Sequence, residues 1–430
     1  MKNILFITTL LTFIALAQAK QMNVILIMAD DLGYECLSSY GGESYKTPHL
    51  DRLSAGGMTF LNAHSQPICT PSRVQIMTGK YNVKNYKKFA YLDPNEKTFA
   101  HYFKDAGYKT CMVGKWQLAG GIDAPYHFGF DEYSLWRIMK NDNQSRYPNP
   151  GIVENGEFKN YQNGEYGPDR MNQFALKFIE DNKDKAFMLY YSMLLVHNPF
   201  EPTPDSEDWD PEAIGLDNLK GGFKGKDNAK YFSDMMSYMD KQVGRLVATL
   251  ERLGLRENTL IIFTGDNGTT RGITSLCQGN EIQGGKGLTS DAGTHVPLIV
   301  NGPSYVLKGV KNSNFVDFSD ILPTICEATE ISIPTEELDD LDGLSFLPQL
   351  KGQKSKVREW VYCWYQKRTD ASKVIQFAMN KDYKLYASGT FFNLQKDILE
   401  KNRLKYDKLS PEEKKIRQQL KQVLKKYQDL

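Results

Sequence analysis

The feature that most constrains the fold is an apolar run near the N-terminus that ends on two acids. Residues 23–28 read NVILIM, and polar and apolar positions do not alternate. Such a run is typical of a central parallel strand covered on both faces. Asp30 and Asp31 follow it, where ligand sites of open α/β sheets lie, and adjacent acids there are costly unless a cation is present. The pair therefore predicts a metal site, although one helix cap and one solvated acid would also explain it.

The rest of the chain continues an α/β alternation. Helical segments separate three further predicted strands, at residues 108–113, 186–195 and 259–263. The longest helix is predicted over residues 228–253, where apolar side chains recur every three or four positions. Short aromatic and β-branched runs over 358–391 predict a small antiparallel sheet, and a capping box at Ser410 predicts a last helix. We therefore expect a large α/β domain over 20–350 and a small C-terminal subdomain over 351–430.

The N-terminal segment indicates the cellular compartment of the protein, and the net charge bears on its partners. Residues 1–19 have the charge, apolar run and Ala17-Gln18-Ala19 end of a secretory signal peptide. A membrane anchor is the alternative, but the run is shorter than the roughly 20 residues that a span needs. No later stretch is apolar enough to span a membrane, so we expect a periplasmic or secreted protein. The net charge of +1 gives no support for nucleic acid as a partner.

The six cysteines are scattered and form no C-x-x-C pair. This spacing argues against a zinc site and against a dense disulfide framework, and leaves a single disulfide open.

Cys69 opens a segment, CTPSR, just before a predicted helix start. Pro71 suits an early helical position, so peptide N–H groups and the positive end of the helix dipole would face the Cys69 side chain. Arg73 adds a fixed positive charge in the same turn. Such a pocket suits an anion beside a nucleophile and predicts an acidified thiol. The alternative is an inert, buried cysteine.

CTPSR and the Thr-Gly pair that follows it resemble the C-x-P-S-R signature of the type I sulfatases, in the alkaline-phosphatase-like superfamily. Further segments match that family in order over most of residues 23–345, including TPHLDRL, where His49 replaces an asparagine and is expected to be structural. The resemblance implies an α/β fold: a large mixed, mostly parallel sheet sandwiched by helices, and a smaller C-terminal antiparallel sheet plus helix. It also implies that Cys69 is oxidised to formylglycine, whose hydrate is the nucleophile. A formylglycine-generating or sulfatase-maturing enzyme is then an expected partner.

The resemblance also implies a metal site. TGDNG follows an apolar strand and is similar to the second metal segment of the family, T-x-D-N-G. The implied ligands are Asp30, Asp31, Asp266, Asn267 and the converted Cys69. Oxygen donors alone suit Ca²⁺ or Mg²⁺ and disfavour zinc and copper. The family favours calcium, with magnesium as the alternative.

Five residues match the positions that the family uses around the sulfate group: Cys69, Arg73, Lys115, His197 and Lys286. The resemblance implies that His197 donates a proton to the ester oxygen. Two positions depart from the family and are predicted to contact substrate. Gln117 stands where a histidine is the proposed base for sulfate release, and glutamine cannot take a proton at neutral pH. His295 stands where an arginine usually precedes Val-Pro, and a purely structural role is its alternative.

The sequence thus predicts an exported bacterial sulfatase that acts on O-sulfate of a polysaccharide or oligosaccharide. Residues 141–168 are rich in glycine, proline and asparagine and predict an irregular rim with a short hairpin. Tyr126, Trp136, Tyr147 and Trp209 could stack on sugar rings or be ordinary packing. Two other functions stay open: a phosphate or phosphonate ester hydrolase of the same superfamily, and an inactive glycan-binding homologue, which Gln117 favours.

Overall fold

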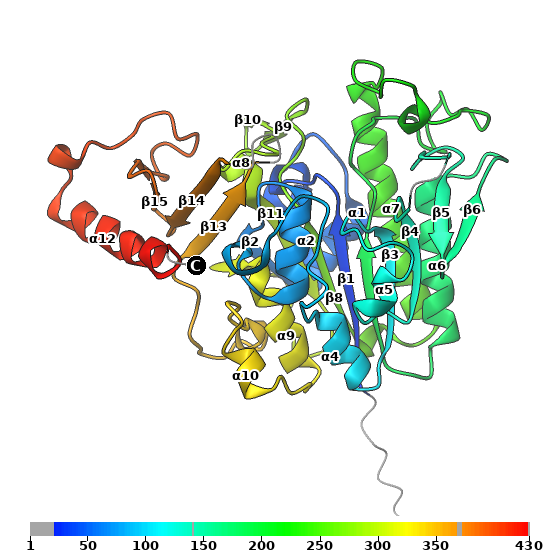
Figure 1. Cartoon of the computed structure of the whole chain (residues 1–430), viewed down its shortest axis with the longest axis horizontal. Coiled ribbons are helices and arrows are strands. Elements are labelled where there is room, and N and C mark those ends of the chain that lie inside the picture. Colours follow the sequence, from blue (N-terminus) through cyan, green and yellow to red (C-terminus); the bar gives the residue numbers. More distant parts are fainter. Residues whose placement is uncertain (1–20, 140–141, 368–371, 429–430) are drawn as a thin grey trace, which may run out of the picture.

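The fold was analysed in a computed structural model that describes residues 21–139, 142–367 and 372–428. The predicted signal peptide, residues 1–19, lies outside these described residues. Figure 1 shows a large α/β body and a smaller sheet with one helix beside it. Within the described residues, none of the helices combines the length and the apolar character that crossing a membrane requires.

The body is built on one ten-stranded sheet with the order β12-β2-β11-β8-β1-β7-β3-β4-β5-β6. Strand β1 pairs in parallel with β7 and β8, β3 pairs in parallel with β7 and β4, and β11 runs antiparallel between β8 and β2. The predicted hairpin of the 141–168 segment is present and extends the sheet as β5 and β6. The strands are β1 (Asn23–Ala29), β2 (Met58–His64), β3 (Lys109–Lys115), β4 (Glu132–Trp136), β5 (Gly151–Glu154), β6 (Glu157–Asn160), β7 (Phe187–Ser192), β8 (Thr259–Gly265), β11 (His295–Asn301) and β12 (Val310–Asp317).

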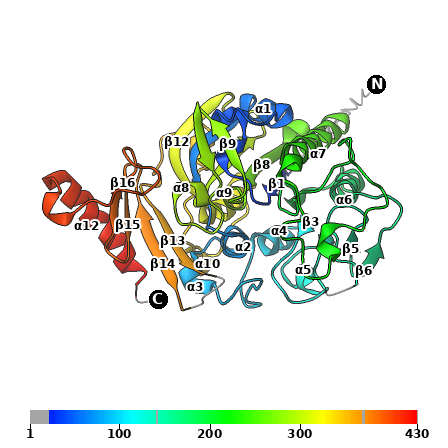
Figure 2. The ribbon, with the colours of Figure 1, turned by 90° about the horizontal axis from the view of Figure 1, so that it is seen from above.

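Helices cover both faces of this sheet and explain why β1 is apolar from Val24 to Ala29. Alternate β1 side chains enter two separate cores: Val24, Leu26 and Met28 pack with α2, α4 and α9, whereas Ile25 and Ile27 pack with α1, α6 and α7 (Figure 2). The helices are α1 (Pro48–Ala55), α2 (Cys69–Thr78), α3 (Asn82–Asn85), α4 (Phe99–Asp105), α5 (Ala124–His127), α6 (Gly167–Asp181), α7 (Phe232–Arg252), α8 (Asp291–Thr294), α9 (Ile321–Ala328), α10 (Thr335–Leu338) and α11 (Leu347–Leu350).

The predicted C-terminal sheet and helix are also present. Four antiparallel strands follow in sequence order: β13 (Val361–Gln366), β14 (Val374–Met379), β15 (Tyr383–Tyr386) and β16 (Phe391–Asn393). Helix α12 (Pro411–Lys426) begins at the expected capping box, in which Ser410 and Glu413 bond each other's backbone N–H groups, and its Leu420 and Leu424 pack on this sheet. A separate hairpin is formed by β9 (Thr274–Cys277) and β10 (Asn280–Gln283). The predicted fold class is confirmed.

One buried arginine joins the C-terminal part to the body. The Arg358 guanidinium binds both carboxylate oxygens of Asp320, donates to Tyr81 Oη at 2.6 Å and to the Asp342 carbonyl at 3.0 Å. Removing one partner of a buried ion pair typically costs 3–5 kcal/mol, so this contact is a strong restraint on how the two parts pack.

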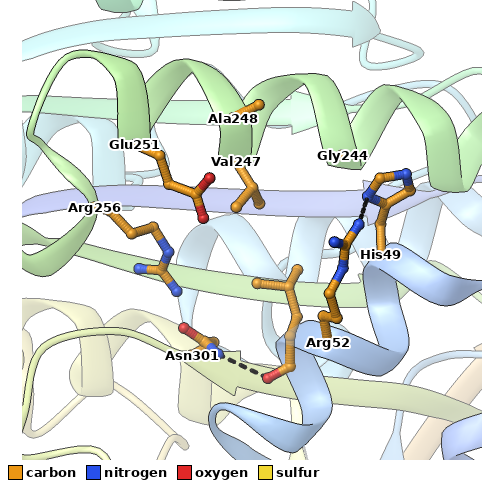
Figure 3. A pocket seen from close by; sticks show the side chains of 9 residues that line it. His49, Arg52, Gly244, Val247, Ala248, Glu251, Arg256 and Asn301 are labelled. Carbon is orange, nitrogen blue, oxygen red and sulfur yellow. Dashed lines mark hydrogen bonds between the residues drawn. The ribbon is translucent and has the colours of Figure 1, made fainter.

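A cleft between α1 and α7 lies at the opposite edge of the sheet from Asp30 and Asp31. Arg52, Arg256 and Asn301 are among the residues that line it (Figure 3). Asn301 is the last residue of β11 and pairs with Ile261, near the start of β8. His49 contacts the Arg52 guanidinium there, and its ring lies so close to Gly244 that a Cβ at Gly244 would be 2.4 Å from His49 Nδ1. His49 therefore serves helix packing, as expected.

Candidate active site

The acidic centre forms where two neighbouring parallel strands end. Asp30 and Asp31 follow β1, and Asp266 and Asn267 follow β8, so parallel pairing brings all four to one edge. The Asp31 N–H donates to Asp266 Oδ1 at 3.0 Å, and the Asn267 amide donates to Asp31 Oδ1 at 3.0 Å. All four residues are fully buried. The four predicted ligands from the two motifs thus lie together.

Three cations from other elements neutralise these acids. Lys115, at the end of β3, donates to both oxygens of Asp30, at 2.7 and 2.9 Å. Lys286 lies 2.6 Å from Asp31 Oδ2, and Arg73, on α2, lies 2.9 Å from Asp266 Oδ2. Burial opposes ionisation of Asp30, yet Lys115 and the neighbouring cations hold its pKa below the usual value. The pKa of Asp266 is raised instead, because burial and the charge of Asp30 outweigh the opposing effect of Arg73 and Lys115.

Cys69 is the first residue of α2, one position further into the helix than expected. All ten residues of α2 are buried, Cys69 with 2% exposure. Burial raises the pKa of the Cys69 thiol and outweighs the opposing effect of Lys115 and Lys286. The prediction of an acidified thiol is therefore wrong, because desolvation of the thiolate exceeds the attraction of two nearby ammonium groups. An unmodified Cys69 lacks the activation of a thiol nucleophile.

His197 follows β7 and completes the cluster. Its Nε2 lies 2.9 Å from Lys286 Nζ and 3.6 Å from Asp31 Oδ2. Burial, aided by Lys286, lowers the pKa of His197 to about 3 against the opposing effect of Asp31. The ring is therefore neutral at neutral pH and carries one N–H donor and one acceptor nitrogen.

The two residues that depart from the family lie in different surroundings. Gln117 follows β3 with a positive φ of 53°, and its Oε1 is buried without a hydrogen-bond partner among the described residues. His295 begins β11: its Nδ1 contacts Asp291 at 3.2 Å, its Nε2 contacts the Leu61 carbonyl at 2.9 Å, and its ring stacks on Tyr34. Both ring nitrogens of His295 are thus engaged within the body, and its role at the substrate stays a prediction.

Other histidines offer no replacement base within the described residues. His49 contacts Arg52, His64 contacts Thr294, and the rings of His101 and His127 bond the carbonyls of His127 and Pro94. None of these contacts reaches the acidic centre. A second histidine from a loop, which could have replaced the base missing at Gln117, is therefore not part of this arrangement.

The residues present fit a hard divalent cation. Asn267 Oδ1 is buried and has no hydrogen-bond partner among the described residues, so an amide oxygen stands free beside three carboxylates. Asp30, Asp31 and His197 offer ligand atoms within 4.8 Å of one another. Oxygen donors of this kind are those that Ca²⁺ and Mg²⁺ take. Asp30, Asp31, Asp266 and Asn267 are therefore able to hold such an ion.

Arg146 is a further residue of the site that was not predicted from the sequence. This residue belongs to the predicted rim, yet it is 4% exposed, and its Nη1 lies 2.9 Å from His197 Nδ1. Asp217, in a short 3₁₀ helix (Leu216–Asn218), holds the guanidinium. Tyr147 and Trp136, for which stacking on sugar rings was one of two predicted roles, are also buried and pack around Arg146. An irregular loop has no periodicity, so the sequence carries no signal for which of its side chains turns inward.

Comparison with known proteins decides the family. The profile of the family described as Sulfatase matches residues 22–331. The chain belongs to the sulfatase family. This sulfatase also matches the profile described as "N-sulphoglucosamine sulphohydrolase, C-terminal" over residues 285–429. The protein is therefore a sulfuric ester hydrolase.

Individual relatives agree with this assignment. The sulfatase is 30% identical to human arylsulfatase A over 383 residues, which is 81% of this chain and 71% of that protein. It is 28% identical to an ulvan-active sulfatase of Formosa agariphila over 338 residues, 75% of this chain and 63% of the relative. A protein whose structure was solved in complex with its substrate, D-glucosamine-2-N,6-O-disulfate, superposes on this chain with a TM-score of 0.75 and 22% sequence identity. The superposition covers 95% of this chain and 99% of that protein, which shows a shared fold.

Proposed function

We propose that this protein is an exported sulfatase that removes O-sulfate from a polysaccharide or oligosaccharide, with Cys69 converted to formylglycine and calcium as the bound ion. The observation that carries the proposal is the meeting of Cys69, Arg73, Lys115, His197 and Lys286 around one acidic centre. The ulvan-active relative and the glucosamine-disulfate complex support a sulfated carbohydrate as the substrate. The N-terminal sequence supports secretion or a periplasmic location.

Magnesium is the alternative ion at the same ligands. When present, the divalent cation would offset negative charge on a sulfate oxygen, and formylglycine at position 69 would supply the attacking oxygen from its hydrate. A sulfatase-maturing or formylglycine-generating enzyme is the partner that this conversion requires.

The residues of the chain have separable tasks in this proposal. Lys115 and Lys286 bind the non-bridging oxygens of the sulfate group, and Arg73 keeps Asp266 and α2 in place. A donor aimed at developing charge in a buried site is worth about 3 kcal/mol. His197 is the proton donor: the negative charge of a bound sulfate ester favours the imidazolium form, whose Nε2 proton passes to the leaving alcohol oxygen and leaves a neutral ring. Proton transfer of this kind contributes roughly 10²–10⁴ in rate.

Gln117 replaces the histidine that would assist release of sulfate from the enzyme. Its unpartnered Oε1 is an acceptor that can hold a water molecule, and that water is the proposed route for the proton in the second half-reaction. Gln117→His should then speed sulfate release if the step is slow in the natural protein. A burst of product followed by a slow phase, abolished in Gln117→His, is the expected kinetic signature.

The direct test is release of inorganic sulfate, measured by ion chromatography over a panel of sulfated oligosaccharides. The calcium-loaded protein is first checked by mass spectrometry for formylglycine at position 69. Release on one substrate, absent in Cys69→Ala, supports the proposal and identifies the sugar. Phosphate or phosphonate ester cleavage in place of sulfate release contradicts it. Glycan binding that Cys69→Ala retains, without turnover by either form, would instead make the protein a binding homologue.

A further inference from the structure

Helix α12 carries a row of cations along one flank. Arg417, Lys421 and Lys425 follow one another at intervals of four residues, so their side chains lie on the same side of the helix. Leu420 and Leu424, on the adjacent side, pack on the C-terminal sheet. Figures 1 and 2 show α12 on the outer side of that sheet, away from the body. The cationic row therefore borders the seam between the outer helix and its sheet.

The three cations line a cavity of about 220 Å³ at this seam. Its other wall comes from β14, β15 and the turn after β15, at Gln376, Tyr386 and Gly389. No acidic side chain is among the described residues that line the cavity. The hollow thus combines three positive charges with one neutral amide, which is a lining that suits an anion.

The cations of the row are not neutralised by the protein itself. Over residues 21–139, 142–367 and 372–428, no carboxylate forms an ion pair with Arg417, Lys421 or Lys425. Arg417 donates to the Gly389 carbonyl at 3.4 Å, and its guanidinium carbon lies 5.1 Å from the centre of the Tyr406 ring. Both lysines are exposed. Like charges four residues apart destabilise a helix, so a bound anion would relieve repulsion within the row.

The form of the row favours a chain with repeated negative charges. Arg417 and Lys425 are eight residues apart, which is about 12 Å along the helix axis. The leucines of α12 are packed on the sheet, so the helix has no free leucine face to insert into a lipid bilayer. The net charge of +1 gives little of the overall positive field that nucleic-acid-binding proteins use. A sulfated polysaccharide has the required charges and is the proposed substrate class.

We propose that the cationic row of α12 is a second binding site for a sulfated polysaccharide, which holds sulfate groups of the chain outside the acidic centre. The choice of this ligand rests on the proposed function. Tyr386 lies between the two sites: it lines the cavity, and its hydroxyl lies 3.2 Å from Thr289 Oγ1, three residues after Lys286 in the chain. Contact at two sites raises the affinity for a polymer above that for a single sulfated sugar.

Binding of dextran sulfate, with unsulfated dextran as the neutral probe, tests the site without turnover. Isothermal titration calorimetry uses the full chain with Cys69→Ala, so that no ligand is hydrolysed. Adding Lys421→Gln and Lys425→Gln should weaken binding about 20-fold at low salt, since each cation beside an anionic array contributes about fivefold. The slope of log affinity against log salt should fall by about 1.4, at roughly 0.7 for each lost contact.

Two further pairs of substitutions are the controls. Lys415→Gln with Lys426→Gln removes the same charge from the same helix, but neither residue lines the cavity, and affinity should not change. Lys421→Arg with Lys425→Arg keeps the charge and should keep the affinity. Equal losses in both glutamine pairs, no loss in the first pair, or equal binding of unsulfated dextran overturns the proposal. Tighter binding of single-stranded RNA or of phosphatidylserine vesicles than of dextran sulfate overturns the choice of ligand.

Kinetics connect the site with the proposed function. For the polysaccharide that releases sulfate, kcat/KM is compared with that for its sulfated monosaccharide. This ratio should fall about 20-fold in Lys421→Gln with Lys425→Gln and stay the same in Lys415→Gln with Lys426→Gln. An unchanged ratio in the first pair overturns the role of the row in substrate binding. Absence of sulfate release from every probe would contradict the proposed function, whereas the dextran sulfate titrations would still decide whether the row binds a sulfated chain.

Discussion

Calcium should stabilise the folded protein through the acidic centre, and the effect should depend on Asn267. A ligand that binds only the folded state at 100 times its dissociation constant adds about 2.7 kcal/mol to the free energy of unfolding. A chain of roughly 400 ordered residues unfolds with an entropy near 0.8 kcal/mol/K, so the melting temperature should rise by about 3 °C. Differential scanning fluorimetry with calcium added back after chelation measures this shift.

The Asn267→Ala variant removes one of four protein oxygen donors, and its Oδ1 is the atom that stands unpaired. If affinity falls tenfold, the same calcium concentration adds only about 1.4 kcal/mol, and the shift drops below about 2 °C. Asp208→Asn is the control, because Asp208 is an exposed acid that pairs with Lys230 and Tyr231 and is not one of the proposed ligands. No calcium-dependent rise in the natural protein, or an equal rise in Asn267→Ala, would refute the assignment of these ligands.

Three further predictions concern stability. Gly244→Ala should lower the free energy of unfolding, measured in urea, by about 1–3 kcal/mol, because its Cβ would meet the His49 ring. His49→Ala in the same chain should restore the stability, and no rescue would contradict this packing. Arg358→Met should cost about 3–5 kcal/mol in the same assay by leaving Asp320 buried and unpaired, and a loss near zero would disprove that restraint. Burial raises the pKa of Glu201 to about 7, so the folded state binds a proton more tightly than the unfolded one. The contribution of Glu201 to the free energy of unfolding should therefore fall by up to about 3 kcal/mol as pH rises from 4.5 through 7, and Glu201→Gln should show a correspondingly shallower pH dependence.

The fold could be predicted from the sequence because the patterns that indicate its strands and helices lie within short segments of the chain. Strand β1 is apolar at every position after Asn23, and that pattern is typical of a strand covered on both faces. Segments far apart in the chain then had to meet, since parallel strands end at one edge of the sheet. Asp30 and Asp266 could be placed together for this reason, before any contact between them was known.

Strand direction does not specify how the cationic side chains pair with these acids. The motifs indicated Lys115 and Lys286, but the distances that pair them with Asp30 and Asp31 depend on strands and loops from three parts of the chain. The predicted low pKa of the Cys69 thiol was wrong because burial raises this pKa more than the nearby Lys115 and Lys286 lower it. Proximity to cations is visible in a motif, whereas complete burial of α2 is a property of the packed body.

The sequence by itself determined the architecture, the strand ends that hold the acids, and the family, because each depends on residues that are close in the chain or fixed by strand direction. Only the tertiary structure decided which loop side chains turn inward and whether burial or nearby charges set the pKa of a site residue. Arg146 lies in a segment without periodicity, and its approach to His197 depends on Asp217, 71 residues away in the chain. Contacts of that kind are set by packing, for which a single sequence holds no repeating signal.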